Sequence, residues 1–426
     1  MLGYRSGLVS LLKGSAARGA QPFIAQKRTW TTLTRSQDAL TIHALNNTSF
    51  PFVWLRDSCQ SPECVHPSTR QKLHRTTDIP MNIAPAEEGV QITPSGIDIT
   101  WKDGHKSTFD HDFLERHSSV PKLTEWHHND HLAEQSWTNK SISQTPDLFI
   151  PYEAIKTPMG LMDAITHLSK YGLIFIPGVP NKDTSDEGCE VRILAERFGG
   201  EIRPTFYGLL WDVVNRSNSR NIAYTNLDLG LHMDLQYFQH PPRYQILHCV
   251  RNQVQGGTSI FVDALHAASV LREKYPDYFD ILTKTPVPFH YINDGHHLHR
   301  EHFTIELRPS SSASEPEISH INYSPPFQAP LPLNTPKEFY VALAKFAELL
   351  NDPQNKYEYT LREGDAVIFE NRRILHARTA FTDKEGSGRI EDGEPNRWLK
   401  GCYFEVDTMV DRVRVLRSKL EKGSLE

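Results

Sequence analysis

Three residues that lie far apart in the sequence constrain most strongly what this chain can fold into: His232, Asp234 and His376. Residues two apart in a β-strand point to the same face, so His232 and Asp234 can bind one metal ion while Met233 points away. His376 follows the turn and apolar run Arg362–Phe369, and we expect it to come from another strand. Only a closed sheet brings such distant ligands together, and the sequence therefore predicts a barrel.

This ligand set indicates the kind of metal site. Two imidazoles and one carboxylate with open positions are typical of non-heme Fe(II) oxygenases, in which the open positions receive a cosubstrate and dioxygen. The same ligands suit catalytic zinc, so a zinc hydrolase is an alternative. A non-catalytic barrel is another, and each histidine could also be an ordinary buried residue. A second His-x-Asp, His128–Asp130, lies in a polar run, and we interpret it as linker or surface.

An arginine that follows the triad favours the oxygenase. Arg397 begins an apolar stretch after His376, and Ser259 follows the turn residues Gly256 and Gly257. A dicarboxylate cosubstrate binds the metal at one end and needs a bidentate partner at the other, which arginine supplies better than lysine. In a zinc hydrolase Arg397 would lack this role. Taken alone, an arginine in a late strand can also be an ordinary structural residue.

Composition narrows the partners. The chain has 426 residues with 38% hydrophobic and 10% aromatic content, which suits a globular protein of two or more domains. Its net charge of −6 leaves no basic excess for phosphates, so we expect a small-molecule partner rather than nucleic acid or a membrane surface. No apolar run has the length of a membrane span. Five irregularly spaced cysteines indicate a reducing compartment.

The first 37 residues have the composition of a mitochondrial transit peptide, which predicts a location in the matrix. They contain serines and threonines and no acid before Asp38. Their basic residues are Arg5, Lys13, Arg18, Lys27, Arg28 and Arg35. The alternative is a disordered tail.

Residues 38–124 predict a small all-β module. Alternating apolar residues indicate strands at Ala39–Leu45, Phe52–Leu55, Gly96–Trp101 and Ser107–Phe109.

Within this module, Cys59, Cys64 and His105 resemble a structural zinc site. Such a site needs four ligands, and His66 is the nearest candidate for the fourth. Two ordinary thiols in a loop are the alternative.

Residues 125–147 are polar, and we predict a linker that lies on the surface. The catalytic domain should then cover residues 148–426. Its predicted elements are a buried strand at 172–177, helices at 160–168 and 190–198, and inserted helices at 264–274 and 337–350, with strands dominating after Thr205.

Four aromatic residues lie close in sequence to the metal-binding strands: Tyr207, Trp211, Tyr224 and Tyr403. Aromatic faces bind quaternary ammonium groups by cation–π attraction. Core packing is the default role of any one of them. Because four occur together, our hypothesis is that they form a cage for such a ligand.

Several segments together resemble the γ-butyrobetaine dioxygenase and trimethyllysine dioxygenase family, from about residue 40 to the end. In the catalytic part they are Asn221–Thr225, Leu231–Asp234, His240–Pro242, Gln245–Cys249, Gly256–Gly257, Val262–Asp263 and Leu375–Arg378. In the amino-terminal part they are Trp54–Cys59 and Asp103–His105, which match that family's zinc module.

The resemblance implies a mainly β protein with inserted helices: a double-stranded β-helix, or jelly-roll, preceded by a zinc-bearing module. It implies an oxygenase that uses Fe(II), 2-oxoglutarate and O₂, with ascorbate as a further requirement. His232, Asp234 and His376 match the iron ligands. Arg397, with Ser259 and Leu247, would bind 2-oxoglutarate. The trimethylammonium cage would be Tyr207, Trp211, Tyr224 and Tyr403, and Asn221 matches a position near the substrate carboxylate.

The expected reaction is hydroxylation of a trimethylammonium carboxylic acid in carnitine synthesis. The segments Asn221–Tyr224 and His240–Pro242 are closer to the butyrobetaine enzyme, and trimethyllysine or another betaine is the alternative substrate. We also expect a homodimer.

Three departures from the family pattern stand out. Ser61 replaces a middle cysteine of the zinc module, Leu235 replaces an aromatic residue after the metal aspartate, and the loop 383–395 is longer.

Overall fold

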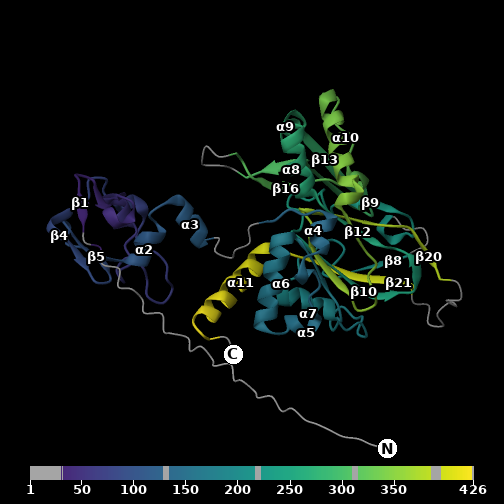
Figure 1. The fold of residues 1–426 in the computed structure, drawn as a ribbon, viewed down its shortest axis with the longest axis horizontal. Helices are drawn as coiled ribbons and strands as arrows, with labels where there is room; N and C mark the ends of the chain where they lie inside the picture. Colours follow the sequence, from purple (N-terminus) through teal and green to yellow (C-terminus); the bar gives the residue numbers. More distant parts are fainter. Residues whose placement is uncertain are drawn as a thin grey trace, which may run out of the picture. The chain divides into compact units, whose positions relative to one another are not determined.

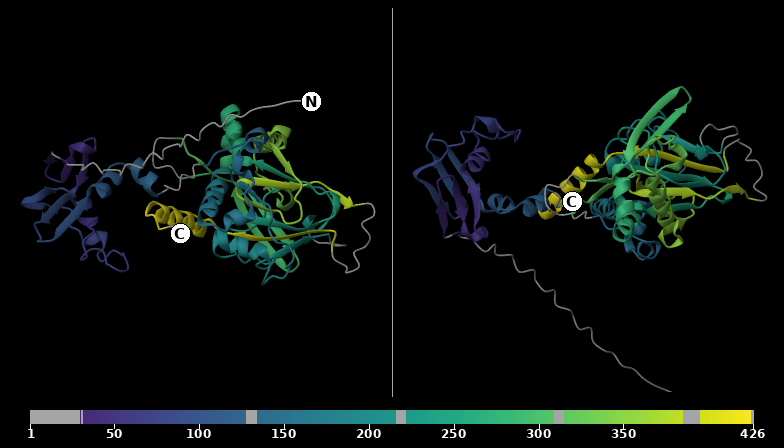
Figure 2. Two further views of the ribbon diagram at one scale, coloured as in Figure 1. Left: turned by 60° about the horizontal axis from the view of Figure 1, so that its bottom comes forward. Right: turned by 90° about the horizontal axis from the view of Figure 1, so that it is seen from above.

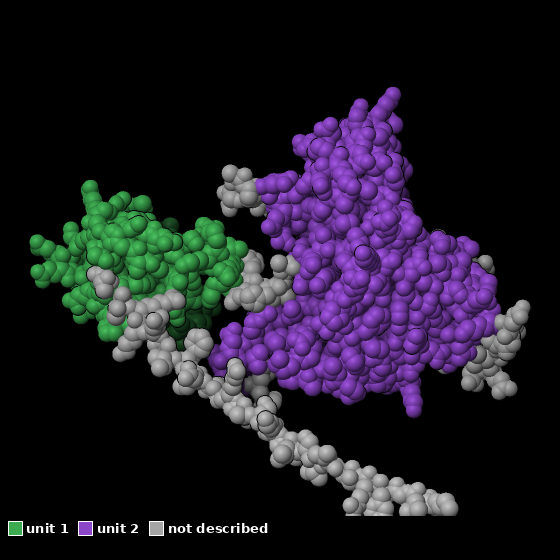
Figure 3. Space-filling model, in the orientation of Figure 1, with its two compact units in different colours: residues 1–128 green, residues 129–426 purple. Residues whose placement is uncertain are grey.

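The computed structural model describes residues 30, 32–127, 134–215, 222–308, 315–384 and 395–424. The chain divides into two compact units, Met1–His128 and Asn129–Glu426, each with hydrophobic clusters of its own (Figure 3). Among the described residues, no helix combines the length and apolarity that crossing a membrane requires.

The first unit contains two three-stranded antiparallel sheets with short helices. One sheet consists of β1 (Leu33–Arg35), β2 (Ala39–Ile42) and β3 (Thr48–Pro51), and the other of β4 (Pro85–Thr93), β5 (Gly96–Trp101) and β6 (Lys106–Asp110). The helices are α1 (Phe52–Asp57), α2 (His111–Arg116) and α3 (Val120–His127). Apolar residues of both sheets and of α1 form one core, which includes Leu40, Phe52, Trp101 and Phe109.

Two strand predictions in this unit need correction. Phe52–Leu55 is not a strand but the start of helix α1, because the buried residues Phe52 and Leu55 are three apart and so lie on one helical face. The strand at Ala39 ends at Ile42 and continues as a 3₁₀ turn, His43–Leu45. The module is therefore β-rich rather than all-β.

The predicted leader overlaps this fold. Strand β1 pairs with β2 in antiparallel register, and Trp30 is buried in the module's core. A leader that ended at residue 37 would remove β1. Residues 1–29 lie outside the described part of the chain.

The second unit is built on two antiparallel sheets that pack face to face (Figure 1). The five-stranded sheet has the order β7 (Leu173–Ile176), β18 (Ala366–Glu370), β10 (Tyr244–Asn252), β21 (Arg397–Phe404), β8 (Trp211–Val214). The four-stranded sheet has the order β17 (Lys356–Tyr359), β12 (Ser259–Asp263), β19 (Ile374–Arg378), β9 (Leu229–His232). This jelly-roll arrangement is the one predicted.

Side-chain alternation explains how the sheets pack. In β7, Leu173 and Phe175 face the other sheet, and the Phe175 and Phe261 ring centroids are 5.7 Å apart. Ile174 and Ile176 face the opposite way, into a core shared with helices. Both faces are buried, which is why this strand is apolar throughout.

Helices cover the outer faces of the two sheets (Figure 1). Beside the five-stranded sheet lie α5 (Tyr152–Ile155), α6 (Pro158–Tyr171), α7 (Glu190–Gly199) and α11 (Val406–Glu421). Beside the four-stranded sheet lie α8 (Ala264–Lys274), α9 (Pro276–Lys284) and α10 (Lys337–Asn351). The four predicted helices are confirmed, whereas α5, α9 and α11 were not predicted.

The remaining elements are short or peripheral. They are α4 (Asn139–Ser143), the pair β11 (Val254–Gly256) and β20 (Phe381–Asp383), and the pair β15 (Ile305–Leu307) and β16 (Ile318–Ile321). Strands β13 (Pro286–Asn293) and β14 (His296–Phe303) form a long hairpin, visible in Figure 2.

The predicted surface linker is partly wrong, because its second half packs into the second unit. Trp137 is buried, its backbone N–H donates to Asp263 Oδ2 over 3.0 Å, and its indole N–H donates to the Tyr171 carbonyl over 2.7 Å. Helix α4 follows at once, with Ile142 fully buried. A tryptophan that finds both an apolar site and a hydrogen-bond acceptor anchors this segment.

Buried histidines predict how acid affects the second unit. His167 lies in α6 against Tyr171, and burial lowers its pKa to about 4. An unfolded histidine titrates near 6.5, so between pH 6.5 and about 4 the unfolded state binds more protons and the free energy of unfolding falls as the pH falls. We expect His167→Leu to lose less stability between pH 7 and pH 4.5, by roughly 2 kcal/mol. Urea unfolding at both pH values measures this, with the exposed His299→Leu as control. Equal losses in wild type and His167→Leu would contradict it.

Candidate active site

Two neighbouring strands of the four-stranded sheet, with the turn that follows one of them, bring the three predicted metal ligands together. His232 ends β9, and His376 lies directly opposite it on β19, with ring centroids 4.1 Å apart. Asp234 Oδ1 lies 3.5 Å from His232 Nε2, and Oδ2 lies 4.0 Å from His376 Nε2. All three side chains therefore offer a ligand atom to a common point.

Two details of the predicted geometry are corrected. Asp234 is not in the strand with His232 but in the turn that follows it. His376 is not on the continuation of the strand Ala366–Phe369, because that strand belongs to the other sheet and a link at residues 371–373 leads from it to β19.

Hydrogen bonds and burial favour the binding of a cation by these ligands. His232 Nδ1 lies 2.9 Å from the Gly230 carbonyl, so this nitrogen carries the proton and the Nε2 lone pair faces Asp234. Burial, and next the nearby His232, lower the pKa of His376 to about 3, which keeps it neutral. Burial would raise the pKa of Asp234, but the two histidines and the Tyr403 hydroxyl outweigh it and lower that pKa. Two imidazoles and a carboxylate fit a ferrous ion.

A cavity extends from these ligands between the sheets, with about 910 Å³ of empty space including its mouth. Its walls include, besides the triad, the predicted residues Tyr207, Trp211, Tyr224, Leu247, Ser259, Arg397 and Tyr403. Asn221 lies outside the described residues.

Arg397 is a buried cation that faces this cavity. Gly257 makes room for it, because a Cβ there would lie 3.0 Å from Arg397 Nε. Among the described residues no carboxylate pairs with Arg397 and its Nε is buried without a hydrogen-bond partner, and burial, together with the neighbouring Arg378, lowers its pKa to about 10. A buried guanidinium without a counter-ion is costly, so this end of the cavity is suited to an anion.

Aromatic residues form another part of the cavity wall. Trp211 lies across strand β21 at Gly401, where a Cβ would meet the indole ring at 2.4 Å, and its ring centroid is 5.3 Å from that of Tyr403. The Tyr403 hydroxyl donates to Asp234 Oδ2 over 2.9 Å. Tyr403 therefore contacts both the aromatic wall and the metal-binding carboxylate.

Sequence reasoning missed several residues of the cavity wall. Tyr237 and Phe327 extend the aromatic surface, and the Tyr207 hydroxyl forms hydrogen bonds with Tyr237 and Tyr291. Gln245 lines the centre of the cavity, and its Oε1 is buried without a hydrogen-bond partner among the described residues. A glutamine inside an apolar strand was the signal available for it.

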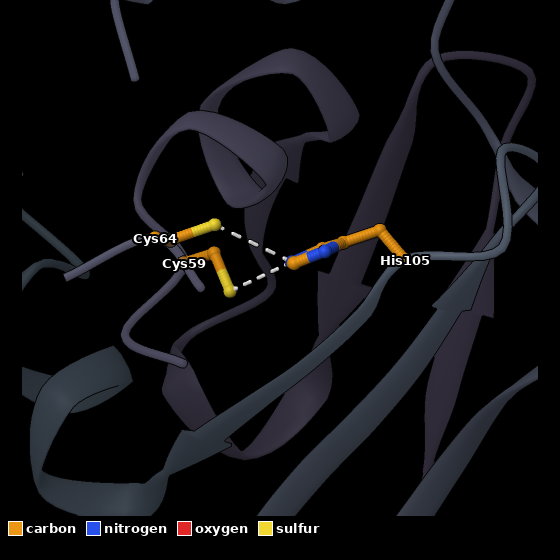
Figure 4. Close-up of side chains that lie close together, drawn as sticks. All are labelled: Cys59, Cys64 and His105. Carbon is orange, nitrogen blue, oxygen red and sulfur yellow. Dashed lines mark hydrogen bonds between the residues drawn. The ribbon is translucent and has the colours of Figure 1, made fainter. Parts of the chain in front are cut away.

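The first unit contains the second predicted metal cluster. Cys59 Sγ and Cys64 Sγ lie 3.2 and 3.4 Å from His105 Nε2, and both thiols point toward the ring in Figure 4. His105 Nδ1 faces Glu63 Oε2 at 3.1 Å, which directs Nε2 at the sulfurs. Burial, and then Cys59, raise the pKa of Cys64.

This cluster supplies three ligands for a metal, whereas a structural zinc site uses four. His66 does not belong to this group of ligand atoms, and its Nδ1 bonds Ser68 and the Thr69 amide within its own exposed loop. The Ser61 hydroxyl oxygen is buried beside Cys64. Among the described residues, the predicted zinc site is thus one ligand short of the usual set.

Fold and site together are those of a non-heme iron oxygenase with room for an anionic cosubstrate. The chain belongs to the family "Taurine catabolism dioxygenase TauD, TfdA family", whose model matches residues 155–403. A second model, "Gamma-butyrobetaine hydroxylase-like, N-terminal", matches residues 31–115. The protein is therefore an iron and 2-oxoglutarate dioxygenase, and membership decides against the zinc hydrolase and the non-catalytic barrel.

Several named relatives match the chain over most of its length. "Dioxygenase str8" of Strobilurus tenacellus is 53% identical and covers 95% of this chain and 94% of its own length. A trimethyllysine dioxygenase of Meyerozyma guilliermondii is 29% identical, covering 86% and 90%. The γ-butyrobetaine dioxygenase of Homo sapiens is 28% identical, covering 88% and 93%. These relatives confirm the family resemblance.

Arg397 should be sensitive to a change that keeps its charge. Arg397→Lys loses the bidentate fork, and hydrogen bonds to charged groups contribute roughly 1.5–3 kcal/mol, so we expect the KM for 2-oxoglutarate to rise about tenfold to a hundredfold. Steady-state kinetics measure this, with Arg412→Lys as control because Arg412 bonds the Glu196 carbonyl away from the cavity. An unchanged KM would assign the anion to Arg378 instead.

Ser61 should limit metal binding in the first unit. We expect Ser61→Cys to raise zinc affinity by at least about tenfold, or ~1.4 kcal/mol, because it completes a four-ligand site. Competition with a chromogenic chelator on the full chain measures the affinity, and Ser68→Cys in the neighbouring exposed loop is the control. Equal affinities of all three proteins would show that Ser61 does not face the metal.

Proposed function

We propose that this dioxygenase hydroxylates a carboxylic acid that carries a trimethylammonium group, with γ-butyrobetaine, which would give L-carnitine, as its substrate. The observation that carries the proposal is the wall of aromatic residues in the same cavity as the triad and Arg397. Aromatic faces attract a quaternary ammonium group, which has no N–H to satisfy.

The chain's residues divide the work of binding. His232, Asp234 and His376 would hold Fe(II), while Arg397, Ser259 and Leu247 would bind 2-oxoglutarate at the other end of the cavity. When bound, iron, 2-oxoglutarate and O₂ supply the oxidising power for C–H hydroxylation, and 2-oxoglutarate leaves as succinate and CO₂. The protein contributes placement and exclusion of water. We expect ascorbate to sustain turnover.

The cage would place the substrate's cationic end. Tyr207, Trp211, Tyr224 and Tyr403 line the cavity, and Tyr403 also contacts the metal-binding carboxylate. A trimethylammonium group held there would lie close to the metal, with the carbon chain running past it. Asn221 is proposed to contact the substrate carboxylate, as its match to the family suggests.

Two alternatives concern the substrate alone. Trimethyllysine dioxygenases and γ-butyrobetaine dioxygenases are equally similar to the chain, at 29% identity in each case. The preference for γ-butyrobetaine rests on the segments Asn221–Tyr224 and His240–Pro242. Trimethyllysine, or another betaine-like acid, is the runner-up, and the relative at 53% identity has a name that specifies no substrate.

We place the enzyme in the mitochondrial matrix on the strength of its basic, acid-free leader. One relative is named "Trimethyllysine dioxygenase, mitochondrial". Zinc in the first unit and a homodimer are further parts of this proposal.

A carbon isostere tests the proposal sharply. In 5,5-dimethylhexanoate a neutral carbon replaces the quaternary nitrogen of γ-butyrobetaine at almost equal shape. Because cation–π attraction contributes about 0.5–2 kcal/mol for each desolvated contact, we expect kcat/KM to fall at least about tenfold with the isostere. Substrate-dependent succinate formation, measured with Fe(II), 2-oxoglutarate and ascorbate, gives the ratio for γ-butyrobetaine, trimethyllysine and the isostere.

Each outcome decides one point. A higher kcat/KM for trimethyllysine would identify trimethyllysine as the substrate instead. Equal values for γ-butyrobetaine and its isostere would contradict the proposed cage. Trp211→Leu serves as the matched variant, because it should lower the preference for the cation over the isostere without changing the KM for 2-oxoglutarate.

A further inference from the structure

Asp234 lies where the sheet no longer supports its backbone. Strand β9 ends at His232, and Met233 still donates its N–H to the Tyr323 carbonyl over 2.9 Å. The backbone groups of Asp234 bond instead to one side chain, Asn371. The Asp234 N–H donates to Asn371 Oδ1 over 2.8 Å, and Asn371 Nδ2 donates to the Asp234 carbonyl over 3.0 Å. The Asn371 amide thus makes the backbone hydrogen bonds that a neighbouring strand would otherwise make to Asp234.

The turn after Asp234 is strained. Leu235 is buried with a φ of 59°, in the left-handed region that costs a residue other than glycine roughly 1–3 kcal/mol. Such a conformation persists only where its surroundings hold it. Asn371 holds the far end of the same turn, because Nδ2 also donates to the Pro242 carbonyl over 3.1 Å and its backbone N–H donates to the Arg243 carbonyl over 2.8 Å.

Asn371 also belongs to the link that leads to the third ligand. Strand β18 ends at Glu370 and β19, which carries His376, begins at Ile374. A fully buried side chain therefore ties the turn that carries Asp234 to the link that leads to His376. The distance between these two ligands depends on that tie.

We propose that Asn371 is a positioning residue of the metal site: it fixes the backbone of Asp234, while the Tyr403 hydroxyl fixes its carboxylate. The role needs an amide, because the side chain must accept from an N–H and donate to a C=O at the same reach. Aspartate has the same shape but would oppose two carbonyl oxygens with a carboxylate. This inference rests on the proposed iron ligands, and its test by metal affinity needs no substrate.

Metal affinity of the full chain tests the proposal. Supporting residues around metal ligands typically change affinity 10–100-fold, and we expect Asn371→Asp to weaken binding of Fe(II) or Co(II), measured anaerobically, by about this factor. The matched control is Asn355→Asp. Asn355 is also buried and donates to a backbone carbonyl, that of Leu349 over 2.9 Å, but it does not line the cavity. Both variants should lower the temperature of unfolding, and only Asn371→Asp should lose metal affinity.

Asn371→Ser keeps the proposal testable if the aspartate variant does not fold. Serine retains one hydrogen-bonding group in less volume, so a smaller loss of affinity is expected. The ratio of succinate formed to substrate hydroxylated should rise in the same variant, because a displaced Asp234 uncouples the two reactions. Unchanged affinity and ratio in a folded Asn371 variant would overturn the proposal.

A further variant separates this inference from the proposed iron site. His232→Ala should abolish metal binding in the second unit. If it binds as wild type does, the ligand assignment fails and the inference with it. If His232→Ala loses the metal while Asn371→Asp keeps full affinity, the inference alone fails.

Discussion

The antiparallel register that sets His232 opposite His376 is the interaction on which the site depends. Two residues directly opposed on neighbouring strands share one face of the sheet, so this pairing alone brings both imidazoles into the cavity. A slip of one residue would turn His376 to the outer face, where Leu375 and Ala377 pack among helices. The many buried apolar residues on that outer face therefore protect the register, and through it the metal site.

Four consecutive polar residues, the last residue of β18 and the three-residue link to β19, connect the two sheets, and each has its own partner. Glu370 pairs with Arg243 at 2.6 Å, Asn371 bonds the Asp234 backbone, and Arg372 donates to Asn322. Arg373 is buried and pairs with Asp263, which also accepts from the Trp137 backbone. Breaking a buried pair leaves an uncompensated charge, so each of these residues holds the link in one conformation.

What the sequence predicted, and what it did not, follows from how local each signal is. The helix Ala264–Lys274 and the strand Gly96–Trp101 were predicted with their observed bounds, because the spacing of apolar residues within each segment is enough to indicate its structure. The His-x-Asp pair and Arg397 carry their chemistry in their residue types. Asn371 had no such signal, because its role depends on a backbone distant in sequence. The strand predicted at Phe52 was wrong because a segment of four residues is too short to distinguish the period of a helix from that of a strand.

The cavity is lined both by a buried guanidinium and by aromatic rings, and burial gives each of them a different ligand preference. Arg397 has no carboxylate partner among the described residues, so an anion that binds it offsets a cost already present in the folded chain. The aromatic faces attract a cation without carrying a formal charge themselves. Asp234, which lines the same cavity, is held on its backbone by Asn371 and on its carboxylate by Tyr403. Under the proposed function, a dianionic cosubstrate would bind the guanidinium and a cationic substrate the aromatic rings, so the two would not compete for the same side chains beside a carboxylate that the fold holds in two ways.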